Sequence, residues 1–285
     1  MTVEADPPRM LTRAQRLTPR NDIFGVGRWL RSSGGSIAVT TSPRRVGRPW
    51  PISRRNEERQ AQSSAIVGVL AVVGLQFEAR IIAGPAVRAI VLGAEPTPLV
   101  TMILPTDRGV ISFGICGGLA PGLAPGACVI ASYISDGTRE WATDKAWTKS
   151  LARSIPNAIV GPILGVDAPI LDVASKFNLH KRHGAVAVDM ESHVAAVAAR
   201  AHGLPLAAVR AVADDATCAL ITVALAGRRA DGSVNVAGVL AALGRQPREL
   251  APLIRLAIRT GSARATLVRL RALLGSDLGT PYTPR

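Results

Sequence analysis

The sequence of 285 residues has few aromatic, cysteine and histidine residues. Aromatic side chains make up only 4% of it, so Val, Leu, Ile and Ala must build most of any core. The three cysteines, Cys116, Cys128 and Cys218, form no CxxC pair, which argues against a disulfide framework and suggests a reducing compartment. The four histidines show no clear zinc-ligand spacing. We therefore expect neither a metal site nor a cofactor.

No apolar run is long enough to cross a bilayer. The longest, Ala65–Leu75, has eleven residues, whereas a transmembrane helix needs roughly 20. The first 62 residues contain no apolar segment typical of a signal peptide. These absences favour a cytoplasmic protein.

Acidic residues are scarce relative to basic ones. The sequence has 34 Lys and Arg against 20 Asp and Glu, a formal net charge of +14. Residues 1–62 hold twelve Arg, no Lys and five acidic residues, residues 228–285 hold ten Arg and three acidic residues, and the part between is neutral. Two basic ends suit an anionic surface, either a membrane or nucleic acid. Solvated tails of an Arg-rich sequence are the simpler alternative.

The composition of the basic ends favours a membrane over nucleic acid. These ends lack the interleaved aromatic residues on which proteins stack single-stranded bases, and no helix-turn-helix or zinc-finger motif occurs. We therefore expect no nucleic-acid partner. Peripheral contact with the inner face of an anionic membrane stays open.

Composition also divides the chain into three parts. Residues 1–62 are rich in Pro, Ser and Arg, so burial cannot offset the entropy of ordering them. This pattern predicts a disordered extension, unless the start site is assigned too early. Residues 63–275 form the predicted domain, and residues 276–285 a tail. Leu and Arg alternate over residues 250–275 with a break at Gly261 and Ser262, which predicts two short amphipathic helices.

Short apolar runs predict the strands of an α/β sheet. They cover residues 65–74, 86–93, 109–114, 127–132, 185–189 and 204–214. Between the last two, Met190, Val194, Val197 and Ala201 share one face of a predicted helix that ends at His202-Gly203. Ligands of such sheets bind at the carboxyl ends of strands. We therefore expect Asp189, Glu191, Asp214 and the glycine-rich segment 114–118 to line one cleft.

Each of these residues has a functional and a structural interpretation. The glycines after the third strand allow a ligand close to the backbone or form an ordinary turn. Glu191, expected one turn into a helix, is an acceptor for a pair of hydroxyls, such as a ribose diol, or complements the helix dipole. Asp214 is a general acid if burial raises its pKa, or a helix N-cap.

The order of these motifs resembles the purine nucleoside phosphorylase and nucleosidase superfamily. The stretch GVISFGICGGLAPGLAPG (109–126), followed by VDMES and VRAVAD, carries the resemblance, which covers about residues 66–274. GLQFEARI, TDKAW, GVDAPI, AVDMESH and the Arg-rich end are most similar to hopanoid-associated phosphorylases. The resemblance implies a three-layer α/β fold with a central twisted mixed sheet. We also expect a homo-oligomer.

The resemblance implies a role for each matching residue. Asp214 would protonate N7 of the departing purine, and Glu191, next to Met190, would accept from the ribose 2′ and 3′ hydroxyls. Glu78 would position the nucleophile. The remaining contacts to sugar and nucleophile would come from the glycine segment, which comprises Gly114, Ile115, Cys116, Gly117 and Gly118.

The nucleophile itself is left open. Phosphorylases often carry Arg and Ser at the positions that read Ser112 and Ile115 here. Phosphate is thus a possible co-substrate, and hydrolysis is the alternative. Arg80 or Arg88 could replace the missing phosphate ligand.

The resemblance implies release of adenine from adenosylhopane, a ribosylated triterpene lipid precursor. Two other functions compete with this one. A soluble nucleosidase acting on methylthioadenosine or adenosylhomocysteine would share the chemistry and need no basic, lipid-facing end. A non-catalytic protein would bind an anionic membrane through its basic ends and keep the middle as a scaffold.

Overall fold

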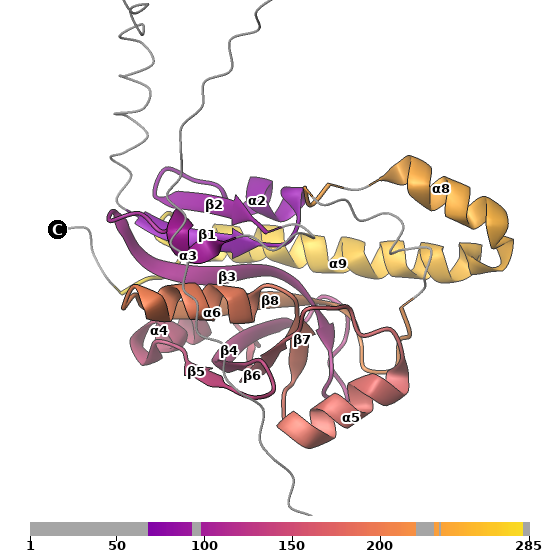
Figure 1. The fold of residues 1–285 in the computed structure, drawn as a ribbon, viewed down its shortest axis with the longest axis horizontal. Coiled ribbons are helices and arrows are strands. Elements are labelled where there is room, and N and C mark those ends of the chain that lie inside the picture. The colour runs from indigo at the N-terminus through magenta and orange to yellow at the C-terminus, as the bar shows by residue number, and fades with distance from the viewer. Residues whose placement is uncertain (1–67, 93–97, 221–230, 234, 282–285) are drawn as a thin grey trace, which may run out of the picture. The chain divides into compact units, whose positions relative to one another are not determined.

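The computed structural model describes residues 68–92, 98–220, 231–233 and 235–281. The predicted extension over residues 1–62 lies outside the described residues. The described residues form a mixed α/β structure around a central mixed sheet, which confirms the predicted fold class (Figure 1).

The strands and helices alternate along much of the chain. The strands are β1 (Gly68–Val73), β2 (Val87–Val91), β3 (Asp107–Gly118), β4 (Cys128–Ser135), β5 (Glu140–Ala142), β6 (Ile159–Gly165), β7 (Ala187–Asp189) and β8 (Leu206–Asp214). The helices are α2 (Gln76–Ile82), α3 (Leu99–Met102), α4 (Lys145–Ser154), α5 (Val173–His183), α6 (Ser192–Ala201), α8 (Val236–Arg245) and α9 (Leu250–Leu274), with a 3-10 turn η1 (Pro247–Glu249) before α9.

The long strand β3 organises the sheet. Strands follow the order β2-β1-β3-β7-β6-β4-β5, and β8 pairs with β3 and β4. The first part of β3 runs parallel to β1, its end pairs antiparallel with β7, and β8 runs parallel to it. The carboxyl ends of β1, β3 and β8 therefore lie at one edge of the sheet, beside β7.

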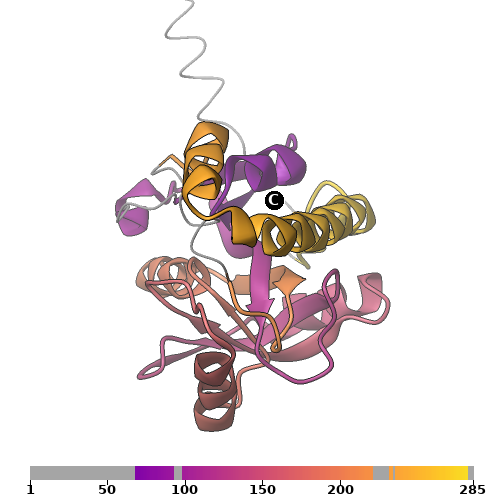
Figure 2. The same ribbon diagram turned by 90° about the vertical axis from the view of Figure 1, so that its right-hand side faces the viewer.

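Helices cover both faces of the sheet. One apolar cluster joins the strands to the alanines of α6, including Ala195 and Ala199, and to Leu99 of α3. The other joins them to α2, α4 and α9, through residues such as Trp147 and Leu267. Both views place α8 beside the first turns of α9, and Figure 1 shows it away from the strands (Figures 1 and 2). The sheet with its two helical layers thus forms the frame, and α8 with the start of α9 extends from it.

Two expectations about individual elements were wrong, and two strands were not predicted. The glycine segment is not a loop, because β3 continues to Gly118. Strands β5 and β6 escaped prediction, since β5 has three residues and β6 contains Gly161 and Pro162. The C-terminal region is a single helix rather than two short ones.

Packing explains why α9 continues through its glycine. A glycine inside a helix costs roughly 1 kcal/mol relative to Ala. The second half of α9 buries Ala263, Leu267, Leu270 and Leu274 against the sheet. Burying one Leu side chain stabilises by about 1.5–3 kcal/mol, which outweighs the glycine. The domain limit expected at residue 275 stays a prediction, and Leu278 just beyond it is buried, with its carbonyl accepting from the Trp147 indole at 3.0 Å.

Candidate active site

A cavity of about 850 Å³ opens at the carboxyl ends of the strands. The segments after β1 and β8, the end of β3 and the junction between β7 and α6 all contribute to its wall. Eight of the ten residues expected from the sequence line it: Glu78, Ile115, Cys116, Gly117, Asp189, Met190, Glu191 and Asp214. Gly114 and Gly118 are not among its lining residues.

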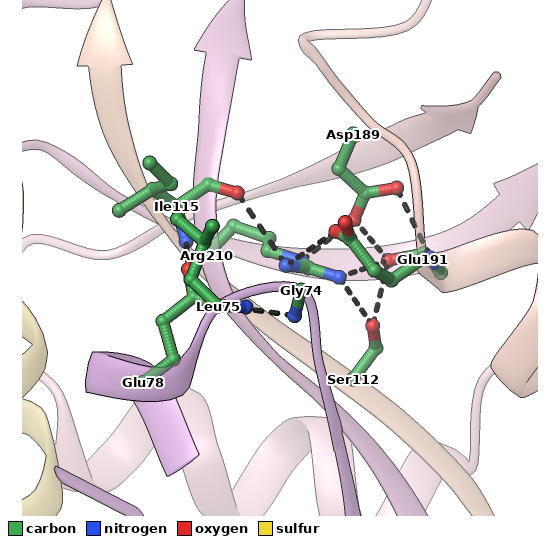
Figure 3. A network of polar contacts seen from close by, with 9 residues as sticks. Gly74, Leu75, Glu78, Ser112, Ile115, Asp189, Glu191 and Arg210 are labelled. Carbon is green, nitrogen blue, oxygen red and sulfur yellow. Dashed lines mark hydrogen bonds and ion pairs between the residues drawn. The ribbon is translucent and has the colours of Figure 1, made fainter. Parts of the chain in front are cut away.

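A buried arginine that the sequence analysis missed holds the carboxylates of this site together. Arg210 lies within β8 and is fully buried. Its Nε lies 2.6 Å from Asp189 Oδ2, and its Nη1 lies 3.3 Å from Glu191 Oε2 (Figure 3). A buried charge is stable only when it is paired and hydrogen-bonded. The signal for it was present, because a lone Arg inside the apolar run LAAVRAVAD requires such partners.

Hydroxyl groups complete the surroundings of Arg210. Nη2 donates to Ser112 Oγ and, at 3.3 Å, to Ser192 Oγ. Ser192 also donates to Asp189 through its hydroxyl and through its backbone N–H. The Asp189 carboxylate is thus engaged with Arg210 and with the first residue of α6. Ser112 occupies the position where phosphorylases often carry an arginine, and here it contacts Arg210 instead.

Glu78 is held by three backbone N–H groups. Its Oε2 accepts from Gly74 and Leu75, each at 2.9 Å, and its Oε1 accepts from Ile115 at 2.8 Å (Figure 3). Burial and the nearby Glu191 raise the pKa of Glu78 to about 7, against the lowering effect of Arg210. A carboxyl group with a pKa near neutrality is suited to act as a general base at that pH.

Glu191 lies at the N-cap position of α6, which corrects the expectation that it lies one turn into the helix. Its carboxylate presses against the end of β1, where a Cβ on Gly74 would lie 2.3 Å from Glu191 Oε1. A Cβ on Gly114 would similarly lie 2.6 Å from Glu78 Oε1 and 2.7 Å from Arg210 Nη1. The two glycines therefore leave room for the carboxylates. Gly114 does so although it does not itself line the cavity.

Asp214 ends β8 and is buried beside a lysine that the sequence analysis also missed. Lys176 of α5 is fully buried, and its Nζ donates to Asp214 Oδ2. Burial raises the pKa of Asp214, and the adjacent Lys176 acts in the opposite direction. Cys116 and Gly117 line the wall nearby, and burial raises the pKa of the Cys116 thiol well above its ordinary value.

The geometry agrees with a comparison against models of protein families. Residues 81–243 match the family described as the phosphorylase superfamily. The chain belongs to this superfamily. Membership confirms the expected class of enzyme, a nucleoside phosphorylase or nucleosidase. A comparison with curated protein sequences gives no match.

Solved structures of nucleosidases are similar to this chain. The chain is similar to 5′-methylthioadenosine/S-adenosylhomocysteine nucleosidase of Neisseria meningitidis in complex with methylthio-immucillin-A, with a TM-score of 0.52 and 16% identity over 73% of this chain and 99% of that one. A mutant nucleosidase of Helicobacter pylori with 5′-methylthioadenosine in its active site gives a TM-score of 0.49 and 16% identity over 73% and 97% of the two chains.

The remainder of the cavity is mostly apolar. Beyond the carboxylates, the cavity continues between α8 and α9, where Val236, Val239, Leu253, Leu256 and Ala257 line it. Arg264 lines this part as well, with its guanidinium 5.9 Å from the centre of the Phe77 ring. The cavity is therefore charged at the sheet and hydrophobic at the helices.

The arginines considered as phosphate ligands lie elsewhere. Arg88 pairs with Asp107 and donates to the Met102 carbonyl at 2.9 Å, and Arg80 is exposed. Neither lines the cavity, where the basic residues among those the structure describes are Lys176 and Arg264. Within the same described ranges, no cluster of side chains could hold a metal ion, and no helix is both long and apolar enough to cross a bilayer.

Proposed function

We propose that this enzyme hydrolyses the N-glycosidic bond of a purine nucleoside whose ribose carries a large apolar group, with adenosylhopane as the candidate substrate. The observation that carries the proposal is the two-part cavity, in which carboxylates at the sheet are continuous with an apolar channel between α8 and α9. A nucleoside with a small, polar substituent would leave that channel filled with water, whereas burying apolar surface there favours binding by about 25 cal/mol per Å².

The carboxylates suit the two halves of the reaction. Asp214 protonates N7 of the purine, so the C1′–N9 bond breaks with its electron pair passing to the base and adenine leaves neutral. Water then attacks C1′ and gives its proton to Glu78, whose pKa of about 7 leaves a large fraction ionised at neutral pH. Glu191 accepts from the ribose hydroxyls and, with Met190, fixes the sugar between acid and base.

Hydrolysis is favoured over phosphorolysis by the charges on the cavity wall. Arg210 is committed to carboxylates and hydroxyls. Lys176 is committed to Asp214, and Arg264 lies over Phe77. A phosphate dianion would have to share the nucleophile position with the Glu78 carboxylate and would be repelled by it.

Product analysis tests this proposal. The protein is incubated with adenosylhopane and with methylthioadenosine, each with and without phosphate, and adenine and the sugar product are identified. We expect free adenine and a reducing sugar from adenosylhopane without phosphate, with a higher kcat/KM than for methylthioadenosine. A sugar 1-phosphate formed only with phosphate would overturn hydrolysis.

A channel variant separates substrate choice from chemistry. Leu253→Gln with Leu256→Gln places two amides in the apolar channel, and we expect kcat/KM for adenosylhopane to fall at least about tenfold, since each buried amide costs about 1–3 kcal/mol. Activity on methylthioadenosine should change less than about twofold. A matched control changes the exposed Leu273 and Val268 to Gln on the far part of α9. Equal losses on both substrates would favour the methylthioadenosine alternative.

Peripheral membrane contact forms a second part of the proposal. Leu240, Ile254 and Ile258 are 61%, 51% and 65% exposed on α8 and α9, the two helices that line the channel. Arg255 lies on the same helix as the two isoleucines and is also exposed. An apolar surface beside a basic residue is typical of contact with an anionic lipid surface, and it would admit a lipid-linked nucleoside without its passing through water.

A further inference from the structure

Lys176 projects from α5 into the buried region beneath the purine end of the cavity. Its ammonium group has three partners: the Asp214 carboxylate, the Asp215 carbonyl at 2.9 Å and the Cys218 carbonyl at 2.9 Å. Lys176 is fully buried and lines the cavity. A lysine side chain is almost never buried to this extent unless it is paired, and these three contacts provide the pairing.

The three partners fit both positions of the proton in this pair. An ammonium has three N–H hydrogens and can donate to all three acceptors, whereas a neutral amine has two N–H hydrogens for the two carbonyls and a lone pair that accepts from a protonated Asp214. The contacts therefore allow the proton to move between Lys176 Nζ and the Asp214 carboxyl group. While Lys176 is the ammonium, Asp214 carries no proton that it could give to a purine.

The other ionisable groups near the pair are either paired elsewhere or neutral. Asp215 follows Asp214 in the chain, and its carboxylate lies 3.6 Å from Arg259 of α9. The Cys116 thiol of β3 stays neutral, because burial raises its pKa well above the ordinary value. Within the described residues, the cation in direct contact with the Asp214 carboxylate is Lys176.

We propose that Lys176 supplies the proton that Asp214 delivers to the purine. This inference rests on the proposed nucleosidase function. When a purine enters, it excludes water from the pair and favours the neutral amine and carboxylic acid over two buried charges. The proton moves from Lys176 Nζ to Asp214, and then to N7 as the C1′–N9 bond breaks and its electron pair passes to the base. Lys176 is left as an amine, Asp214 as a carboxylate, and solvent returns the proton after adenine leaves.

The test compares pH profiles of variants at Lys176. Lys176→Gln keeps a hydrogen-bond donor for the two carbonyls but holds no transferable proton. In this variant Asp214 must carry its own proton, which burial allows only below its raised pKa. We expect kcat/KM for adenine release to be within about tenfold of wild type near pH 5 and to fall at least about 100-fold below wild type by pH 8.5, the size of a lost general acid. Lys176→Met should show the same profile.

Lys176→Arg separates charge from proton transfer. A guanidinium keeps the positive charge, but it does not release its proton in proteins. We therefore expect this variant to lose at least about 100-fold in kcat/KM across pH 5–8.5, although its thermal unfolding midpoint should stay closer to wild type than that of Lys176→Met.

Two results would overturn the inference. Near-wild-type activity of Lys176→Arg would show that the positive charge alone suffices. A loss in Lys176→Gln that is equal at every pH would show that Lys176 only stabilises the local structure. Failure of the inference is distinct from failure of the proposed function. If wild-type protein releases no adenine from any adenosine nucleoside tested, the proposed function falls. If wild type is active and the variants behave in either way above, only the role of Lys176 falls.

Discussion

The two halves of the cavity are built in different ways. At the sheet, Glu78, Asp189, Glu191 and Asp214 are buried, and each is fixed by backbone groups or by a buried cation. At the helices, the wall consists mainly of aliphatic side chains on α8 and the first half of α9, none of which is buried. We infer that the charged half performs the chemistry and that the helical half selects the substituent. Variants in the first half should therefore change stability and turnover, and variants in the second should change substrate preference.

The largest expected effect comes from removing Arg210. Arg210→Met leaves the Asp189 and Glu191 carboxylates buried without their cation, and breaking a buried pair costs about 3–5 kcal/mol. We expect the free energy of unfolding, measured by urea denaturation, to fall by that amount and adenine release to be lost. The exposed Arg80→Met should change the free energy of unfolding by less than about 0.5 kcal/mol. A similarly small change in Arg210→Met would contradict the role of this arginine in holding the site together.

The next largest effect concerns Asp214. Asp214→Asn keeps the size of the side chain but cannot deliver a proton, so we expect adenine release to fall at least about 100-fold. The neighbouring Asp215→Asn serves as a control, because that carboxylate is bonded to Thr217 and paired with Arg259. Turnover of Asp214→Asn within a few-fold of wild type would remove this residue from the mechanism.

The residues of the candidate site differ in how far the sequence could predict them. Glu191 and Asp214 follow apolar runs, and the carboxyl ends of strands are known to carry ligands, so local pattern was sufficient for both. The partners of Arg210 and Lys176 could not be named from the sequence, because they are distant in the chain. Lys176 and Asp214 are 38 residues apart, and only the folded sheet brings α5 to the end of β8. A lysine in a polar helix gives no sign in the sequence that it will be buried.

Element limits failed for similar reasons. The apolar run predicted that the third strand ends at Gly114, but pairing with β8 and β7 extends β3 to Gly118. A local rule also broke α9 at Gly261, where packing of its later leucines on the sheet decides otherwise. In both places, tertiary contacts override the conformational preference of glycine.

A smaller effect concerns the pH dependence of the base. The pKa of Glu78, about 7 in the folded protein, lies above its ordinary value of 4.5. The folded state thus binds this proton more tightly than the unfolded chain, so this group's contribution to stability is present below about pH 4.5 and is lost as the pH rises through about 7. Activity should change in the opposite direction, with kcat/KM rising as Glu78 ionises near pH 7.

A variant at Glu191 tests whether Glu78 controls this rise of kcat/KM with pH. Its carboxylate is the second cause of the raised pKa of Glu78, after burial. Glu191→Gln should therefore move the rise of kcat/KM with pH to lower pH. It should also lower kcat/KM for ribonucleosides more than for 2′-deoxyribonucleosides. Glu140→Gln, at an exposed position on β5, should leave the rise in place. An unmoved rise in Glu191→Gln would mean that a group other than Glu78 controls it.

The smallest expected effect, and the one confined to the helical half, is on membrane binding. Four arginines of α9 are candidates for this role and are not equivalent: Arg255, Arg259, Arg269 and Arg271. Arg271 donates to the Ile82 carbonyl at 3.0 Å, Arg269 donates to Thr266 at 2.9 Å, and Arg259 lies near Asp215. Changing all four would therefore disturb the domain as well as any lipid contact.

A cleaner variant combines Arg255→Gln with Ile254→Ser and Ile258→Ser, since all three side chains are exposed on α9. We expect wild-type protein to sediment with vesicles containing anionic lipid at low salt, and less so at high salt, because screening weakens the attraction of basic residues. The variant should lose most of this binding, since one arginine contributes about 1 kcal/mol and each isoleucine up to about 1.5–3 kcal/mol. It should still cleave methylthioadenosine as wild type does. Folded, active wild-type protein that fails to sediment with these vesicles would refute membrane contact and leave the chemistry at the sheet unaffected.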